Sequence, residues 1–283
     1  MSARLGGAIA ICVALGVGCR STANADASAD AHAGANADAK ADADANADTV
    51  RGEWIEKVAL GDGVAFVTPP VGATGKRPVI VAIHGAVDDP GLMCGAWRII
   101  TDVYSFVVCP AGTPIGADVP GRKYVWGSTE QIEKRALAAL EMVEARYPEH
   151  VVAGAPAIYV AFSQGATMAG PLLARHADRF PRAVLTEGGY HAFEPVGLAP
   201  AYQKAGGSRV LYTCSQGGCA SGFDLSRAAL DRAGVGARVV FSGNHGHSMP
   251  PPVRESLHDV LGWLVEGLPG WEGYAAAPKL SAH

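Results

Sequence analysis

The sequence has little charge and no excess of basic residues. Only 18% of its 283 residues are charged, and 23 Lys and Arg stand against 27 Asp and Glu, a formal charge of −4. Binding to a nucleic-acid backbone depends on clustered basic side chains that neutralise the phosphates. A nearly balanced, slightly acidic chain offers no such cluster, so we expect no nucleic-acid partner.

The amino end lacks a hydrophobic run long enough to stay in a bilayer. The apolar stretch from Leu5 to Gly18 is shorter than the roughly 20 residues that a membrane-spanning helix needs. It follows Arg4 and so has the charged start and short apolar centre of a secretory signal. We therefore predict a signal peptide over residues 1–19 and an exported protein.

The signal ends in Leu15-Gly16-Val17-Gly18-Cys19, which resembles the bacterial lipobox. In that motif a peptidase cuts before the Cys, and the thiol is then acylated. Gly18 fits the position before the cut, whereas Gly16 departs from the preferred Leu. The resemblance implies lipidation of Cys19, with the protein held at the cell envelope, in the outer membrane, through its lipid. The alternative is an ordinary cleaved signal, which would leave the protein periplasmic or secreted.

Large apolar side chains are missing from residues 20–50, where Ala alternates with Asp, Asn, Ser and Lys. This alternation has the period of a strand, but it supplies no apolar surface that could offset the entropy lost on ordering. We predict a disordered, self-repelling linker over 20–50. Residues 51–270 would then form one folded domain and residues 271–283 a tail.

Cysteine is scarce, and most of it lies in the domain. Of the six cysteines, one belongs to the signal and one is the lipobox Cys19. An even number in an exported domain favours disulfides, and four cysteines allow three pairings. Local spacing favours Cys94 with Cys109 and Cys214 with Cys219, and buried free thiols are the alternative.

Apolar periodicity from residue 51 onward predicts strands that alternate with helices. A hairpin opens the domain, and continuous apolar runs such as Pro78–Ile83 and Ala157–Phe162 are typical of central strands covered on both faces. We therefore expect a mixed, mostly parallel sheet between two helical layers, with ligands at the carboxyl ends of its strands. The predicted strands are 53–60, 63–68, 78–83, 105–109, 157–162, 182–187, 208–213 and 237–242, and the predicted helices are 91–101, 128–147, 164–178, 222–233 and 252–267.

A serine follows one of the central strands. The chain reads Ala161-Phe162-Ser163-Gln164-Gly165, with small residues two before and two after the serine, and then enters a helix. This pattern resembles the nucleophile elbow of the α/β-hydrolase family, G-x-S-x-G, with Ala161 in place of the first Gly. The resemblance implies an α/β-hydrolase fold, which is a three-layer αβα arrangement with a mixed, mostly parallel eight-stranded sheet, and no cap domain. The alternative is a helix N-cap serine at a sheet edge.

The resemblance also implies roles for residues elsewhere in the chain. The backbone N–H groups of Ala86 and Gln164 would form the oxyanion hole, with His84 as a positioning residue. His247, which follows Gly246 in a loop after the last strand, would be the catalytic histidine. His245 and His247 also permit a metal site, with His191 or an acid as the third ligand, but no strong spacing motif completes such a site. We expect no metal and no cofactor.

The acid is the least determined member of the site. The loop after 208–213, where the family commonly places an Asp, contains no carboxylate. Glu187 ends the strand before it and is our first choice, and Asp224, at the start of a helix, is the alternative. Trp126 and Tyr190 lie on predicted edge loops and are expected to bind substrate, although aromatic residues of this kind are as often plain packing.

These features together predict an exported serine hydrolase. It would cleave a carboxylic ester of a small molecule through an acyl-Ser163 intermediate, with Ser163, His247 and Glu187 as a catalytic triad. The alternative is a non-catalytic envelope lipoprotein that retains the hydrolase fold as a binding scaffold, since fold does not guarantee function.

Overall fold

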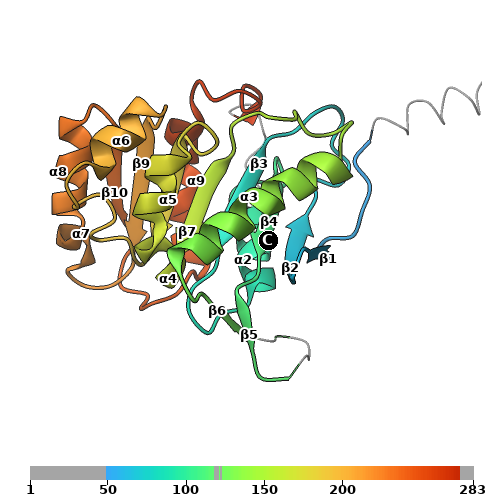
Figure 1. The fold of residues 1–283 in the computed structure, drawn as a ribbon, viewed down its shortest axis with the longest axis horizontal. Coiled ribbons are helices and arrows are strands. Elements are labelled where there is room, and N and C mark those ends of the chain that lie inside the picture. Colours follow the sequence, from blue (N-terminus) through green and yellow to red (C-terminus); the bar gives the residue numbers. More distant parts are fainter. Residues whose placement is uncertain (1–48, 118–120, 122, 275–283) are drawn as a thin grey trace, which may run out of the picture. The chain divides into compact units, whose positions relative to one another are not determined.

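The computed structural model describes residues 49–117, 121 and 123–274 (Figure 1). The predicted signal peptide, Cys19, almost all of the linker and the end of the tail lie outside the described residues. Within the described ranges, no helix has the length and apolar character that crossing a membrane requires.

The predicted eight-stranded sheet is present, and it is mixed. Its strand order is β1-β2-β4-β3-β7-β8-β9-β10. The first three strands in this order pair antiparallel and all later pairs are parallel, as expected from a hairpin followed by strand–helix alternation. The strands are β1 (Glu56–Leu60), β2 (Gly63–Thr68), β3 (Val79–Ile83), β4 (Phe106–Pro110), β7 (Ile158–Phe162), β8 (Arg182–Thr186), β9 (Arg209–Cys214) and β10 (Gly236–Phe241).

Helices cover both faces of the sheet, which gives the predicted three layers. In β3, Val81 packs into one core cluster together with residues of α3, α5, α6 and α8, and Ile80 packs into a second cluster with residues of α2 and α9. Figure 1 shows α3 lying along the first face. The helices are α2 (Pro90–Ile100), α3 (Thr129–Arg146), α4 (Gln164–Thr167), α5 (Ala169–Arg175), α6 (Leu198–Lys204), α7 (Cys219–Gly222), α8 (Asp224–Arg232) and α9 (Pro251–Val265).

Two helices show the local signals that the sequence carries. The N-cap of α3 is Ser128, whose hydroxyl accepts a hydrogen bond from the N–H of Gln131, as a capping residue should. The helix predicted over 164–178 is divided into α4 and α5. Pro171 has no N–H to donate to Thr167, four residues earlier, so a continuous helix would leave that carbonyl unpaired.

Some elements and boundaries were not predicted, among them the short α7 before α8. A separate two-stranded sheet, β5 (Thr113–Ile115) with β6 (Lys123–Val125), precedes α3, and the short α6 lies between β8 and β9. The domain limits 51–270 are also too narrow, because Val50, Trp271 and Tyr274 are buried. Tyr104 packs against both Trp271 and Tyr274, so the first residues of the predicted tail belong to the core.

Both predicted disulfides are formed in the structure. Cys94–Cys109 joins α2 to β4, and both of its residues are completely buried. Cys214–Cys219 joins the end of β9 to the start of α7. The second disulfide therefore closes the loop at the carboxyl edge of the sheet that contains Ser215 and Gln216.

Candidate active site

Ser163 occupies the sharp turn between β7 and α4. Its backbone has φ 49° and ψ −112°, in a region that non-glycine residues rarely adopt and that is found where surrounding structure enforces it. The Ser163 N–H donates to the carbonyl of Thr186 at the end of the neighbouring strand β8, at 2.9 Å. The turn is thereby fixed to the sheet, with the serine at its carboxyl edge.

Small residues around this turn are required by close backbone contacts. A Cβ at Gly165 would lie 2.6 Å from Ile83 Cγ2 and 2.9 Å from the carbonyl oxygen of His84. A Cβ at Gly188 would lie 2.5 Å from the carbonyl oxygen of Ser163. Contacts of this length exclude any side chain, so these glycines are needed for the backbones to approach.

His247 contacts the serine directly. Its Nε2 lies 2.7 Å from Ser163 Oγ, within hydrogen-bond distance. The imidazole comes from the loop that follows β10 and packs against the ring of Phe162, with 5.0 Å between the ring centroids. His247 is about half exposed, with 47% of its side-chain surface accessible, so it faces the solvent side of the serine.

Glu187 lies on the other side of His247 and is buried. Its side chain is inaccessible, and its Oε2 is 3.9 Å from His247 Nδ1, too long for a direct hydrogen bond. The residue has φ 52° at the end of β8, a backbone turn that directs the carboxylate across the strand ends. Asp224, the alternative acid, is exposed at the start of α8 and pairs with Arg227.

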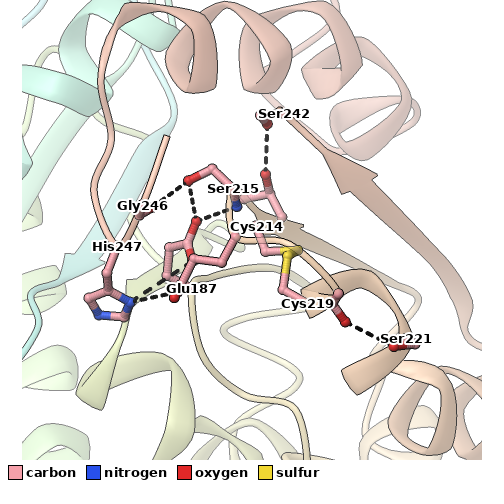
Figure 2. Close-up of a disulfide and its surroundings, with 11 residues drawn as sticks. Glu187, Cys214, Ser215, Cys219, Ser221, Ser242, Gly246 and His247 are labelled. Carbon is pink, nitrogen blue, oxygen red and sulfur yellow. Dashed lines mark hydrogen bonds and ion pairs between the residues drawn. A yellow bond between two sulfur atoms is a disulfide. The ribbon is translucent and has the colours of Figure 1, made fainter. Parts of the chain in front are cut away.

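Two residues of the disulfide-closed loop after β9 hold the Glu187 carboxylate. The N–H of Ser215 donates to Glu187 Oε1 at 2.5 Å, and Ser215 Oγ lies 2.6 Å from the same oxygen. Gln216 Nε2 donates to Oε2 at 2.8 Å and is 3.2 Å from His247 Nδ1. Figure 2 shows Glu187 next to Ser215, with His247 beyond it and the Cys214–Cys219 disulfide beside the loop.

Two backbone N–H groups near Ser163 have no acceptor among the described residues. These are the amides of Ala86 and Gln164. Gln164 is the first residue of α4, where helical N–H groups lack an intrahelical partner. The Ala86 loop is held by an antiparallel bridge between Asp88 and Tyr124 of β6, and it includes Val87 at φ 52°. Free, fixed donors of this kind can stabilise a developing negative charge.

The His84 side chain supports the Ala86 loop through hydrogen bonds. Its Nε2 accepts the N–H of Gly112 at 3.0 Å, and its Nδ1 lies 2.6 Å from the carbonyl of Gly85. Since a backbone N–H can only donate, the His84 proton is on Nδ1 and donates to Gly85. Burial lowers the pKa of His84 to about 4, so the ring is neutral near pH 7. This agrees with a positioning role.

Neither Trp126 nor Tyr190, the expected substrate-binding residues, lines the cavity that reaches Ser163. Trp126 is 3% exposed, stacks on His84 at 4.6 Å between ring centroids and donates its indole N–H to the His84 carbonyl at 3.0 Å. Tyr190 stacks on Phe223 at 4.5 Å. Trp126 is therefore buried against His84, whereas Tyr190 is only partly buried, and substrate binding by either residue stays a prediction.

The main cavity beside Ser163 is built from other residues. It has a volume of about 630 Å³ and reaches Ser163, His247 and the Ala86 loop. One wall is α2 and another is the start of α9. Most of the lining side chains are apolar, and several of them are exposed, notably Trp54, Val87, Leu92 and Ile99.

The sequence did not single out several residues that matter at this site. The loop after β9 was noted for its cysteines and for having no carboxylate, yet its Ser215 and Gln216 hold the Glu187 carboxylate at the end of the preceding strand, β8. Trp54 and Arg254, which line the cavity, belong to no recognisable sequence motif. No group of three or more His, Cys, Asp or Glu side chains within the described ranges could hold a metal ion.

No protein-family model matches the sequence, and neither does any curated protein. Solved structures do resemble the fold. An esterase from Pyrobaculum calidifontis is 15% identical, with a TM-score of 0.52, over 81% of this chain and 90% of that one. A fungal esterase from Rhizomucor miehei is 15% identical, with a TM-score of 0.53, over 83% and 88%. An S-formylglutathione hydrolase from Agrobacterium tumefaciens is also 15% identical, with a TM-score of 0.53, over 76% and 94%. At this identity the likeness concerns the fold alone.

Proposed function

We propose that this chain, which has the α/β-hydrolase fold, is an exported serine hydrolase that cleaves a carboxylic ester through an acyl-Ser163 intermediate. The observation that carries the proposal is the distance of 2.7 Å between Ser163 Oγ and His247 Nε2, at a serine held in an enforced backbone turn. A nucleophile within hydrogen-bond reach of a base is the arrangement that acyl transfer needs.

The residues have distinct roles in the proposed reaction. His247 Nε2 takes the proton of Ser163 as Oγ attacks the ester carbonyl, and the amides of Ala86 and Gln164 stabilise the resulting oxyanion. The tetrahedral intermediate then expels the alcohol, which receives the proton from His247. A water molecule, deprotonated by His247, attacks the acyl-Ser163 ester, and the released serine regains its proton.

Glu187 is the proposed triad acid. A carboxylate beside Nδ1 orients the imidazole and stabilises the imidazolium that forms in each step. Its burial and its proximity to His247 favour it over Asp224, which is paired with Arg227 on the surface. The chain order of serine, acid and histidine is the order found in this fold.

The cavity supports a small-molecule ester with an apolar acyl or alcohol part as substrate. The cavity wall formed by α2 presents Leu92 and Ile99. Met249, two residues after His247 in the sequence, also lines the cavity. Apolar walls with few polar groups are typical of small-molecule sites. Asp88 and Arg254 are the two side chains of opposite formal charge that line the cavity, so the lining carries no net charge from them, and we propose a substrate that is uncharged near the ester.

Export and lipid attachment are also part of the proposal. The two disulfides support an oxidising compartment, and the lipobox-like sequence supports acylation of Cys19. A single acyl chain binds a membrane only weakly, and stable anchoring needs a second chain or another membrane-binding feature. An acylated lipobox cysteine carries more than one acyl chain. Metabolic labelling with an alkyne fatty acid should mark the wild-type protein and not Cys19→Ser. Equal labelling of both would contradict the lipid anchor.

One observation favours the alternative of a non-catalytic binding scaffold. The carboxylate and the imidazole are separated by 3.9 Å, and an uncoupled acid would leave His247 a poor base. A fluorophosphonate probe separates the two functions, because it reacts only with an activated serine.

The deciding experiment is therefore labelling and ester hydrolysis by wild type, Ser163→Ala and a matched control, Ser221→Ala. Ser221 is an exposed serine whose hydroxyl donates to Gly218. Wild type and the control should label and hydrolyse short-chain esters, and Ser163→Ala should lose several orders of magnitude of activity with an unchanged melting temperature. An unlabelled wild-type protein, or activity that survives in Ser163→Ala, would rule the proposal out.

A further inference from the structure

The Gln216 side-chain amide contacts both of the groups that a triad brings together. Gln216 Nε2 is 2.8 Å from Glu187 Oε2 and 3.2 Å from His247 Nδ1, while the carboxylate and the imidazole are themselves 3.9 Å apart. The amide nitrogen is therefore closer to Nδ1 and to Oε2 than these two atoms are to each other, and it competes with each of them as a hydrogen-bond partner of the other.

The orientation of this amide follows from its neighbours. If the amide were turned over, its oxygen would lie 2.8 Å from Glu187 Oε2, and two acceptors cannot share a hydrogen bond while the carboxylate is ionised. The nitrogen therefore faces Glu187 and His247. An amide nitrogen carries two N–H groups and accepts none, so one can donate to each partner.

This orientation sets the tautomer of His247. If Gln216 donates to Nδ1, that nitrogen has no proton, and the neutral ring carries its proton on Nε2. Nε2 then donates to Ser163 Oγ across the 2.7 Å contact. A protonated Nε2 cannot accept the serine proton, so this arrangement is a resting state.

The carboxylate is satisfied in this state without the imidazole. Glu187 Oε1 accepts the N–H of Ser215 and lies against its hydroxyl, and Oε2 accepts from Gln216. Buried charges need such donors. A productive triad requires one change: the Gln216 amide must leave Nδ1, so that Nδ1–H can donate to Oε2 instead.

We propose that Gln216 is a positioning residue that sets the tautomer of His247 and holds the site at rest until the amide is displaced. The kinetic consequence of this inference rests on the proposed function. Its structural core, the proton position on His247, can be measured whether or not the protein turns over an ester.

The test uses nitrogen-15 chemical shifts of His247 in the mature protein, at a pH where the ring is neutral. The variant is Gln216→Met, which keeps the length of the side chain and removes both N–H groups. The control is Gln203→Met, on the exposed face of α6. Wild type and Gln203→Met should show an unprotonated Nδ1, and Gln216→Met should show the proton on Nδ1.

Kinetics give the second readout. Gln216→Met should raise kcat and the fluorophosphonate labelling rate about five-fold, the factor that one neutral hydrogen bond supplies between two tautomers. KM should stay unchanged, because Gln216 is not among the residues that line the cavity.

Several results would overturn the inference. A wild-type protein with the proton on Nδ1 would do so without any variant, and so would Gln216→Met with an unchanged tautomer. A fall in kcat like that of a missing acid would make Gln216 a required relay instead. If the tautomer switches as stated but no form labels or hydrolyses esters, the proposed function fails and the role of Gln216 stands.

Discussion

The two sides of the site are held by different kinds of interaction. Ser163 is fixed by steric contact, since its turn needs bare glycines at positions 165 and 188. Glu187 and His247 are fixed by hydrogen bonds from side chains and loop amides, and His247 is half exposed. Steric fixing leaves one geometry, whereas hydrogen bonds of this kind can be exchanged for others with little change in free energy.

The nucleophile and the acid differ in how precisely they must be placed. A nucleophile must meet a carbonyl within a few tenths of an ångström, so its side of the site benefits from rigidity. The acid acts through His247 and tolerates alternative partners. Here the acid comes from the end of β8, and the loop after β9, from Ser215 onward, supplies donors in place of a carboxylate.

The largest effect should come from the acid side. Glu187→Gln keeps the size of the side chain but removes the charge that stabilises the imidazolium, and kcat for a short-chain ester should fall by roughly 10³ to 10⁴. Asp224→Asn, on the surface of α8, should remain close to wild type. The reverse order would assign the role to Asp224, and two silent variants would mean that the site operates without an acid.

The two disulfides offer a comparison of intermediate size. Cys94–Cys109 closes 15 residues between α2 and β4, and its loss in the double Ala variant should cost about 3 kcal/mol of unfolding free energy with kcat largely kept. Cys214–Cys219 closes only 5 residues, so its loss should cost less stability.

The second disulfide should instead matter for activity. Ser215, which fixes Glu187, follows Cys214 directly, and freeing this loop should lower kcat about ten-fold through a misplaced acid. Urea denaturation and ester kinetics of the two double variants measure both quantities. Equal effects of the two disulfides on kcat would contradict a division of the site into two sides.

The sequence predicted the features that depend on local pattern. The strand from Gly63 to Thr68 has the predicted bounds. The strand, turn and helix around Ser163 could also be predicted, because these three elements lie within a few residues of one another in the sequence. Glu187 was placed by its position at the end of a strand, because parallel strands end at one edge of the sheet.

The features that were missed depend on contacts between distant segments. Trp126 is buried, and its indole donates to the carbonyl of His84, 42 residues away, which no local pattern encodes. Gln216 reaches Glu187 and His247 from 29 and 31 residues away. Side-chain amides have no sequence period, so their partners are decided only when the loops pack together.

The pH dependence of stability tests the rigid side of the site. Burial lowers the pKa of His84 to about 4, whereas a histidine in the unfolded chain titrates near 6.5. Between these values the unfolded state binds more protons, so the free energy of unfolding falls as the pH falls. From pH 7 to pH 5 the loss due to His84 should be about 2 kcal/mol.

His84→Asn isolates this contribution, because the Asn amide can replace the Nδ1–H donor to Gly85 without titrating. Urea denaturation at pH 7 and pH 5 should give a smaller difference for His84→Asn than for wild type, while the exposed His191→Asn should keep the wild-type difference. The nucleophile side would then lose stability in acid through one buried neutral ring. If wild type and His84→Asn lose the same free energy over this interval, His84 is not the neutral support of the Ala86 loop, and the rigidity of that side must come from the glycine contacts alone.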